Sequence, residues 1–232
     1  MRSVVLSFDD GTIYDKRFIV LLDKYGLKAT FNLNSGLGEY VWYLDSFPVE
    51  RLNLLENKEI YKNHEVASHT VTHPYLTSLT KEQLIHEIND DVNALESIFN
   101  REVSTFAVPM DQCNEEIIKW IKEYTKIKYL RIPSFTDSYV PHDRYHICPN
   151  AWYYDEKIYE KIEDFSNNLN DHSVFIIVGH SYEFEVNNDW DKIERLIAYL
   201  ANNNNNKIVV NTFSNAMKDL FKLDEEDWLL FI

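Results

Sequence analysis

Two adjacent carboxylates, Asp9 and Asp10, end the first apolar segment of the chain. Residues 3–8 are rich in apolar and β-branched side chains, which predicts a buried strand, and Gly11 then allows the backbone to turn away. Successive side chains of a strand point to opposite faces, so the two carboxylates can have different tasks, one as a base and one as a metal ligand. An Asp-Gly pair is also ordinary turn chemistry, so the interpretation depends on the rest of the chain.

Two histidines four residues apart, His69 and His73, follow a second short strand that we expect at residues 64–68. On one helical turn both rings would face the same way. Neutral imidazoles at this spacing are typical of half of a divalent-metal site, and Asp10 could complete a three-ligand set with a position open for water or substrate. The alternative is a pair of polar residues that cap a helix starting near Pro74.

A third ionisable group, His180, ends the apolar run at residues 174–179, which predicts another buried strand. A single histidine in this place is often structural. Parallel α/β barrels, however, build their sites where strands end, and three strand ends of this chain carry groups that can do chemistry. We therefore expect the carboxylate pair, the histidine pair and His180 to lie together.

The elements that must position these groups follow from the alternation of apolar runs with amphipathic stretches, which favours a parallel sheet with crossover helices. We expect strands at residues 3–8, 28–33, 64–68, 103–108, 127–132, 174–179 and 207–212. We expect helices near residues 15–25, 114–125, 155–168, 190–202 and 213–221. A further helix opens at a capping box formed by Thr80 and Gln83, and its apolar stripe comprises Leu84, Ile88, Val92 and Leu95.

The bulk composition limits the class of protein. A chain of 232 residues with 45% hydrophobic and 14% aromatic residues can form one domain, residues 1–232, with a core and an aromatic-lined groove. We expect a loop at residues 202–206 and a short acidic tail from residue 224. The net charge of −15 argues against nucleic acid and against an anionic membrane surface as partners, and it fits a neutral ligand. The two cysteines, Cys113 and Cys148, lack metal-ligand spacing and are expected to be free thiols.

In these motifs and in their order, the chain resembles the polysaccharide deacetylase family of metal-dependent carbohydrate esterases. Residues 7–10 resemble the first motif of the family, residues 68–73 the second and residues 178–180 the last, while residues 28–31 are similar to its second strand. The landmarks span residues 3 to about 183. The resemblance implies an α/β fold, a distorted (β/α) barrel of about seven parallel strands, and an enzyme that hydrolyses a carbon–nitrogen bond.

The resemblance also implies roles for individual residues. Asp10, His69 and His73 would hold a divalent ion, which we expect to be zinc and which would polarise the acetamide carbonyl and lower the pKa of a bound water. Asp9 would be the general base, and the backbone N–H of Met110 would stabilise the oxyanion. His180 would protonate the leaving amine, because an amine expelled without a proton is a very poor leaving group.

The third motif of the family is altered in this chain. It falls on residues 107–110, where Ala107 replaces the arginine that orients the catalytic aspartate. We predict that Arg131, on the next strand, projects into the site and contacts Asp9. The alternative is a surface or structural arginine.

The fourth motif has its nearest match at residues 150–152, with Asn150 in place of an aspartate that tunes the general acid. Glu183, three residues after His180, is a candidate substitute, although an exposed loop glutamate is the alternative. Trp152 and Tyr182 are the expected substrate-binding residues. The loop with His142 and His146 could line the same groove or be plain surface, and no catalytic role is expected for His64, His86 or His172.

The sequence therefore predicts a metal-dependent hydrolase that removes N-acetyl groups from an N-acetylated sugar or polysaccharide. Three alternatives remain: a deacylase or amidohydrolase of a small non-sugar amide, a catalytically weakened glycan-binding relative, and a structural or interaction protein. Residues 1–6 run directly into the first motif, without room for a signal peptide, so we expect a cytoplasmic protein unless a leader was removed. The sequence does not indicate an oligomeric state.

Overall fold

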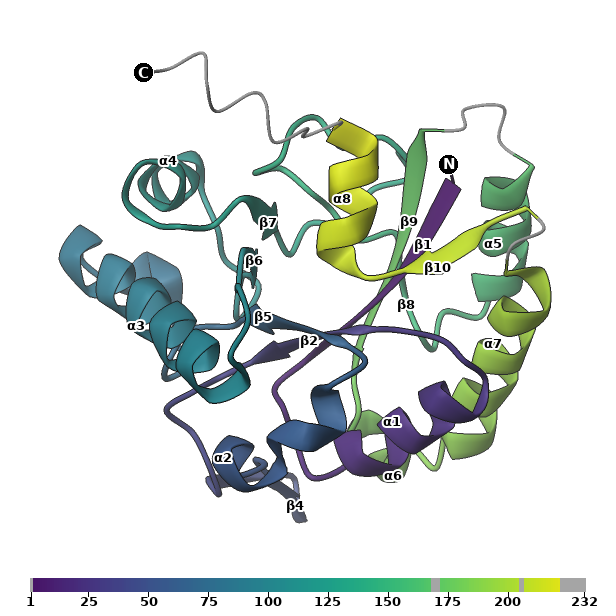
Figure 1. Cartoon of the computed structure of the whole chain (residues 1–232), viewed down its shortest axis with the longest axis horizontal. Helices are drawn as coiled ribbons and strands as arrows, with labels where there is room; N and C mark the ends of the chain where they lie inside the picture. The colour runs from purple at the N-terminus through teal and green to yellow at the C-terminus, as the bar shows by residue number, and fades with distance from the viewer. Residues whose placement is uncertain (1, 168–171, 205–206, 222–232) are drawn as a thin grey trace.

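The computed structural model describes residues 2–167, 172–204 and 207–221. Its main sheet has the strand order β7-β6-β5-β2-β1-β9-β8, and β10 pairs with the first half of β1. Every strand pair of this sheet is parallel, and the sheet curls into a half-barrel, as Figure 1 shows. This confirms the expected distorted barrel of parallel strands. The bounds are β1 (Arg2–Asp9), β2 (Thr30–Leu33), β5 (Glu65–Ser68), β6 (Thr105–Ala107), β7 (Tyr129–Arg131), β8 (Ala151–Trp152), β9 (Ser173–His180) and β10 (Val209–Asn211).

The segment between β7 and β8 bridges the two edges of the curled sheet. The N–H of Leu130 donates to the carbonyl of Arg144 at 2.8 Å, and the N–H of Ile132 donates to the carbonyl of Ile147 at 2.9 Å. Further along, the N–H of Asn150 donates to the carbonyl of Ile176 in β9 at 2.9 Å. The barrel is therefore distorted at this point, because irregular chain takes the place of a regular strand. The two-residue strand β8 in this region was not predicted.

Helices cover the outside of the sheet at the predicted places (Figure 1). The longer ones are α1 (Asp15–Lys24), α3 (Lys81–Phe99), α4 (Glu115–Tyr124), α5 (Ile158–Ser166), α7 (Trp190–Asn203) and α8 (Phe213–Phe221), and the shorter ones are α2 (Leu54–Asn57), η1 (Lys58–Tyr61), η2 (Leu76–Ser78) and α6 (Glu183–Val186). The capping box of Thr80 and Gln83 is present at the start of α3, and its apolar stripe is buried. None of the described helices is both long and apolar enough to cross a membrane.

The expected start of the loop at residue 202 needs correction, and the expected acidic tail lies outside the described residues. Helix α7 continues through Asn203, so the loop expected at residues 202–206 begins later than predicted. Asn202 and Asn203 can extend the helix because its apolar face, which includes Ile193, Ile197 and Leu200, is anchored in the core. Residues 205–206 and the acidic tail from residue 224 lie outside the described part of the chain.

An antiparallel hairpin, β3 (Val41–Leu44) and β4 (Phe47–Glu50), was missed by the sequence analysis. Its strands are short, and most of their side chains are exposed, so they give little hydrophobic signal. The hairpin docks on the turn that follows β1: the N–H of Leu52 donates to the carbonyl of Gly11 at 2.8 Å, and the N–H of Ile13 donates to the carbonyl of Glu50 at 3.0 Å. It therefore brings residues 40–52 next to the two carboxylates.

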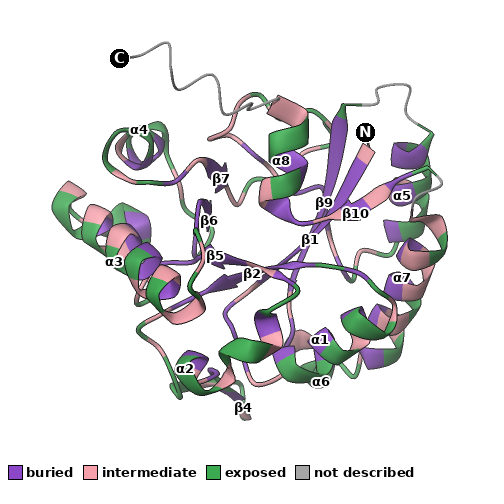
Figure 2. Cartoon of the chain, viewed as in Figure 1, coloured by how far each residue is buried: buried purple, intermediate pink, exposed green. Residues whose placement is uncertain are grey.

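Apolar side chains between the sheet and its helices form the core. Figure 2 shows buried residues along the strands and on the sheet-facing sides of α1, α3 and α7. Below the end of β1, the rings of Phe8, Phe18 and Phe184 pack together, with Phe8–Phe18 centroids 4.5 Å apart and Phe18–Phe184 centroids 5.1 Å apart. This packing fixes the strand whose tip carries Asp9, since close-packed aromatic side chains leave little room for displacement.

Candidate functional site

The carboxyl ends of β1, β2 and β9 meet at one edge of the sheet because the three strands are parallel. In the register of the sheet, Asp9 is paired with His180 of β9 on one side and with Asn32 of β2 on the other. The Asn32 amide donates to Oδ1 of Asp9 at 2.7 Å. The predicted convergence of the first and last motifs is thus a direct consequence of strand register.

The chain turns sharply after Asp9, and this turn aims the Asp10 carboxylate. Asp10 and Gly11 have φ angles of 86° and 64°, in the left-handed region that favours glycine. A Cβ at position 11 would lie 2.8 Å from Cδ2 of Leu33, so glycine is required here for space as well as for conformation. The N–H of Asp10 donates to the carbonyl of Asn32 at 3.0 Å and ties the turn to β2.

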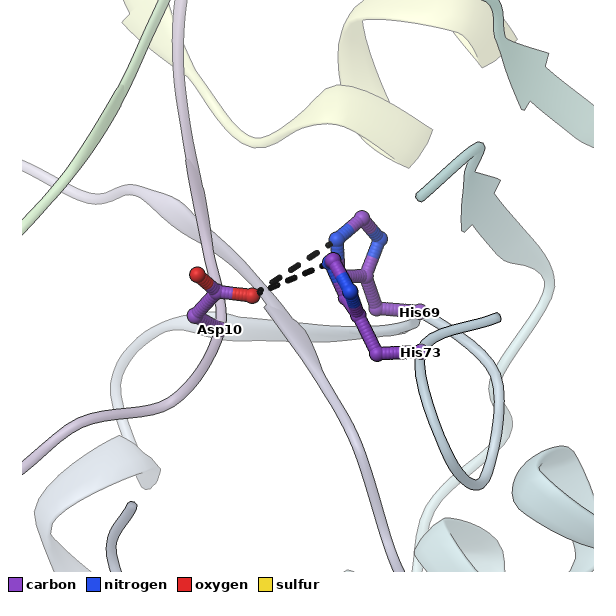
Figure 3. A group of neighbouring side chains, drawn as sticks. All are labelled: Asp10, His69 and His73. Atoms are coloured by element: carbon purple, nitrogen blue, oxygen red, sulfur yellow. Dashed lines mark ion pairs between the residues drawn. The ribbon is translucent and has the colours of Figure 1, made fainter. Parts of the chain in front are cut away.

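Asp10, His69 and His73 converge as a candidate metal centre (Figure 3). One ligand atom from each residue lies within 4.8 Å of the others. Oδ1 of Asp10 is 3.3 Å from Nε2 of His73 and 3.9 Å from Nε2 of His69. This oxygen is buried and, although Nη2 of Arg51 lies 3.0 Å away as an ion-pair partner, it accepts no hydrogen bond of suitable geometry, so a lone pair remains for a metal ion. The donor set of one carboxylate and two imidazoles fits a divalent ion such as zinc.

The two histidines lie on a turn, and the helical turn considered from their spacing is wrong. His69 follows β5 directly, and the chain then turns through Thr70 and His73, whose φ angles are 70° and 57°. The hydroxyl of Thr70 accepts from the N–H of His73 at 3.0 Å, which closes the turn. The buried carboxylate of Asp91 accepts from the hydroxyl of Ser68 at 2.6 Å and from the N–H of His69 at 3.2 Å. A turn held by side chains thus brings the rings together, with centroids 4.9 Å apart.

The local environment keeps both histidines neutral and Asp10 ionised, as metal ligands require. Burial lowers the pKa of His69 to about 3, and burial also lowers the pKa of His73. Nδ1 of His69 lies 2.8 Å from the carbonyl oxygen of Ala107, so Nδ1 carries the proton and Nε2 offers its lone pair toward Asp10. Burial opposes ionisation of Asp10, yet the charges of the Arg51 guanidinium and the His180 imidazolium hold the pKa of its carboxyl down, at about 2.

Asp9 is paired with Arg131, as the sequence analysis predicted. Nη2 of Arg131 lies 2.7 Å from Oδ1 and 2.6 Å from Oδ2 of the carboxylate. Arg131 is buried, and its β7 position is in register with Ala107 of β6. Burial raises the pKa of Asp9, but the charge and hydrogen bonds of Arg131, together with the nearby imidazoles, bring the pKa below its usual value. The carboxylate is therefore ionised and oriented, as a general base must be.

His180 faces Asp10 from the opposite side of the site and is partnered by Glu183. Its Nε2 lies 3.9 Å from Oδ2 of Asp10, and its Nδ1 lies 3.3 Å from Oε1 of Glu183. The other carboxylate oxygen of Glu183 accepts from the backbone N–H of His180 at 3.0 Å. Burial lowers the pKa of the imidazole, but the contacts with Glu183 and Asp10 prevail and raise it to about 9.

Asn150, the nearest match to the aspartate of the fourth motif, has a different task. Its amide group donates to the carbonyls of Thr136 and Ser138 at 3.0 Å each. Its side-chain oxygen accepts from the N–H of Ile176 in β9 at 2.8 Å. These bonds use the Asn150 side chain to fix the irregular segment against β9, and Asn150 is neutral. The carboxylate next to the His180 imidazole is that of Glu183.

A cavity of about 710 Å³ opens at these groups, and its lining includes Asp9, Asp10, His69, His73, Met110, Arg131, Trp152, His180 and Tyr182. Trp152 and Tyr182 both stack on the His180 ring, with centroid distances of 6.0 Å and 5.0 Å. Met110 lines the cavity with φ at 56°, so its backbone is in the left-handed region just after β6. Tyr40, Trp42 and Phe135 add further aromatic surface to the wall.

The remaining histidines lie elsewhere. Nδ1 of His64 accepts from the N–H of Ala29 at 3.2 Å, and His86 is an exposed partner of Asp90 on α3. His142 and His146 gather around Asp143, outside the lining of the cavity, so the interpretation as a plain surface loop is the better one. His172 is exposed.

Sequence reasoning missed several residues that contact the candidate metal ligands, among them Arg51 and Asp91. Arg51 of the hairpin lies 3.0 Å from Oδ1 of Asp10, and Asp91 of α3 supports the backbone of His69. Nothing in the local pattern around Arg51 distinguishes it from a surface arginine. Asp91 could have been found, because it places a carboxylate beside Val92 and near Ile88 on the buried stripe of a helix, where charges are rare without partners.

Comparisons with known proteins agree with the order of the motifs. Residues 1–129 match the family model described as Polysaccharide deacetylase. The chain is 28% identical over 120 residues to YxkH of Bacillus subtilis (strain 168), a protein that carries the name of this family. It is 27% identical over 124 residues to the peptidoglycan-N-acetylglucosamine deacetylase of Bacillus cereus. These matches cover 51% and 53% of this chain but 40% and 53% of the two relatives, so the chain spans about half the length of the curated relatives it matches.

Solved structures show the same fold. Peptidoglycan deacetylase PdaC from Bacillus subtilis is 20% identical with a TM-score of 0.58, over 98% of this chain and 95% of that chain. The Xyl-CE4 domain of a multidomain xylanase from the hindgut metagenome of Trinervitermes trinervoides is 19% identical with a TM-score of 0.60, over 93% and 89%. A mutant of a CE4 family pseudoenzyme with restored enzymatic activity is 16% identical with a TM-score of 0.60, over 94% and 68%. At these identities the likeness shows the fold alone.

Family membership rests on the family model, which matches 129 of the 232 residues and includes Asp9, Asp10, His69 and His73. Arg131, Trp152, His180 and Tyr182 come from the part of the chain beyond this match, and the fold brings them to the same cavity. The chain belongs to the polysaccharide deacetylase family.

Proposed function

We propose that the chain is a metal-dependent deacetylase that removes N-acetyl groups from the sugars of a glycan. The observation that carries the proposal is the joint arrangement of a candidate three-ligand centre, an arginine-held carboxylate and a histidine around one cavity. The family and the name of the Bacillus cereus relative, a peptidoglycan-N-acetylglucosamine deacetylase, support an N-acetylated glycan as the substrate class.

Asp10, His69 and His73 would hold the ion, and we expect zinc because the donors are two imidazoles and one carboxylate. When bound, the ion would act as a Lewis acid toward the acetamide and favour ionisation of a water molecule. Two features of these residues fit a bound ion. Both imidazole rings are neutral, and Oδ1 of Asp10 is buried and accepts no hydrogen bond of suitable geometry.

Asp9 takes the proton of the attacking water in this proposal. Arg131 and Asn32 hold the carboxylate in one orientation, so it need not reorganise when the proton arrives. The backbone N–H of Met110 is the candidate donor to the negative charge that develops on the acetamide oxygen. A backbone donor does not depend on which side chain follows Pro109.

His180 supplies a proton to the leaving amine. Glu183 and Asp10 favour the imidazolium, and the Tyr182 and Trp152 rings fix the plane of the imidazole. Trp152, which is only partly buried, also offers a face on which a sugar ring can stack. The products would be acetate and a free amino sugar.

Acetate release from a panel of N-acetylated oligosaccharides, with metal content measured on the same protein, tests the proposal. The panel should contain chitooligosaccharides, peptidoglycan fragments and small non-sugar amides, and Asp9→Asn is the matched inactive control because it conserves shape. Release from the sugars and not from the small amides is the expected result. Release only from the amides would favour an amidohydrolase, and glycan binding without acetate release by the metal-loaded protein would establish a binding relative.

A further inference from the structure

Arg51 is a buried arginine whose guanidinium ends beside a proposed metal ligand. It follows β4, and its side chain is only 6% exposed. Nη1 donates to the backbone carbonyl of Asp10, and Nη2 lies 3.0 Å from Oδ1 of the same residue. The ring of Trp42 covers the guanidinium, with 4.8 Å from Cζ to the ring centroid. Arg51 therefore grips Asp10 at two points and is itself held in place.

The same guanidinium also reaches the loop that carries the histidines, through one intermediate residue. Nη1 of Arg51 donates to the side-chain oxygen of Asn34, which follows β2. The amide nitrogen of Asn34 donates to the carbonyl oxygens of His69 and Thr70, at 2.5 Å and 2.9 Å. All the side chains in this chain of contacts are buried. One hydrogen-bonded connection thus joins the turn of Asp10 to the turn of the two histidines.

Both turns contain non-glycine residues in left-handed conformations: Asp10, Thr70 and His73 have φ angles of 86°, 70° and 57°. Such conformations cost free energy and persist only where surrounding contacts hold them. The backbone carbonyls that Arg51 and Asn34 bind belong to Asp10, His69 and Thr70, which are residues of these turns. Removal of the connection should let the turns relax independently and should change the separation of the ligand atoms.

We propose that Arg51 is a positioning residue of the metal centre: through Asn34, its guanidinium holds the Asp10 turn and the His69–His73 turn at the separation that one ion requires. The inference rests on the metal centre of the proposed function, and it assigns a task to the β3–β4 hairpin, which delivers Arg51 to the site. The rival role is a simple counter-charge to Asp10. The two roles predict opposite signs, because a fixed positive charge beside a dication weakens metal binding on electrostatic grounds alone.

The test is the dissociation constant for Zn²⁺, measured by competition with a chromophoric chelator on the purified full chain. We expect Arg51→Gln to bind zinc about 10- to 100-fold more weakly than the wild type, the usual range when a partner of a metal ligand is removed. Arg51→Lys should also bind zinc more weakly, since Nη1 bridges the Asp10 carbonyl and Asn34 while Nη2 lies beside Oδ1 of Asp10, and an ammonium group lacks this second, rigidly placed nitrogen. The Co²⁺-loaded variants should show an altered d–d absorption spectrum, which reports the ligand geometry directly.

Arg131→Gln is the matched control, because it removes the other buried arginine of the site, whose contact is with Asp9 and not with a ligand. Its zinc affinity should be unchanged or higher. Asn34→Ala should weaken zinc binding as Arg51→Gln does, and the double variant should be less than additive because both changes break the same connection. Circular dichroism of the metal-free proteins checks folding, and Arg51→Lys and Asn34→Ala decide the matter if Arg51→Gln does not fold.

Zinc affinity that is unchanged or higher in Arg51→Gln would overturn the proposal in favour of a counter-charge. A zinc affinity of Arg51→Lys equal to that of the wild type would overturn the proposal as well. Wild-type protein that binds no zinc would overturn this inference and the metal centre together. Wild-type protein that binds zinc but releases no acetate would contradict the proposed function alone, and the affinities of the variants would still decide the role of Arg51.

Discussion

Arg131 lies directly beside Ala107 in the register of β6 and β7, so the guanidinium enters the site from the neighbouring strand. The resemblance in sequence places Ala107 where the family's third motif carries its arginine. Ala107 is fully buried and leaves room for a longer side chain from one strand further along the sheet. The pair shows how a parallel sheet can move a functional group by one strand and still deliver it to the same carboxylate, here Asp9 at 2.6 Å.

Arg131→Met should lower the rate of acetate release by about 10²-fold or more, because the base loses its fixed orientation and its ion-pair partner. Zinc content should stay near one ion per chain, since Arg131 does not contact Asp10, His69 or His73 among the described interactions. Steady-state kinetics together with elemental analysis measures both quantities. Full activity in this variant would show that Asp9 needs no partner, and loss of metal would assign the arginine to the ion site.

Substitution of Asp9 and substitution of Asp10 should affect zinc binding and turnover differently. Asp10→Asn replaces a charged ligand by a neutral one and should lose zinc, and the double variant His69→Ala/His73→Ala should do the same. Asp9→Asn should keep zinc and lose turnover by about 10²-fold or more, the usual scale for removal of a general base. Stoichiometric metal in the folded double histidine variant would refute the ligand assignment. Near-normal turnover in Asp9→Asn would place the base elsewhere.

Glu183 should control the alkaline limb of the pH–rate profile. In the proposed mechanism His180 must be protonated, so activity should fall as the pH rises through the pKa of this imidazole. Burial depresses that pKa, and the Glu183 carboxylate is the largest of the contacts that raise it. Glu183→Gln removes the negative charge but keeps the shape, so the alkaline limb should move to lower pH while zinc content stays constant. An alkaline limb that does not move would exclude Glu183 as the partner of the acid.

The sequence was sufficient for the parts of the site that follow from strand ends. Asp9, Asp10 and His180 each follow an apolar run, and the parallel arrangement of those runs requires their carboxyl ends to meet. The contact of Arg131 with Asp9 was also predictable. Position 107 carries no arginine, and the neighbouring strand is the nearest part of the sheet that can supply a guanidinium instead. These features depend on local patterns and on one global rule.

Other features depend on contacts between segments that local patterns do not encode. The histidine pair has helical spacing, yet Thr70 and His73 adopt left-handed conformations that Asn34 and the Thr70 hydroxyl stabilise. The hairpin that carries Arg51 has few buried side chains and is fixed by backbone hydrogen bonds to the turn after β1. Such tertiary hydrogen bonds become visible only once the chain is folded, because their partners lie far away in the sequence.

Asp15, at the start of α1, should make the stability of the protein fall as the pH rises toward neutrality. Its buried carboxylate accepts from the hydroxyl of Tyr61 at 2.7 Å and from the hydroxyl of Ser181, which neighbours His180. Burial raises the pKa of this carboxyl from 3.8 to about 7. The folded state therefore binds more protons than the unfolded chain between these values, and the contribution of Asp15 to stability, complete below about pH 4, is lost as the pH rises through about 7.

Asp15→Asn should remove this dependence, because the amide does not titrate. Urea unfolding of the metal-free protein at pH 4.5, 6 and 8 measures the free energy of unfolding. From pH 4.5 to pH 8, the stability of the variant relative to the wild type should rise by at least about 1 kcal/mol, the equivalent of about one pKa unit. Asp45→Asn is the control: Asp45 is exposed at the β3–β4 turn with φ at 52°, a conformation that asparagine tolerates well. Its difference from the wild type gives the baseline for loss of an exposed carboxyl. A difference for Asp15→Asn that stays constant with pH would mean that Asp15 is ionised throughout, with Tyr61 and Ser181 offsetting the cost of its burial.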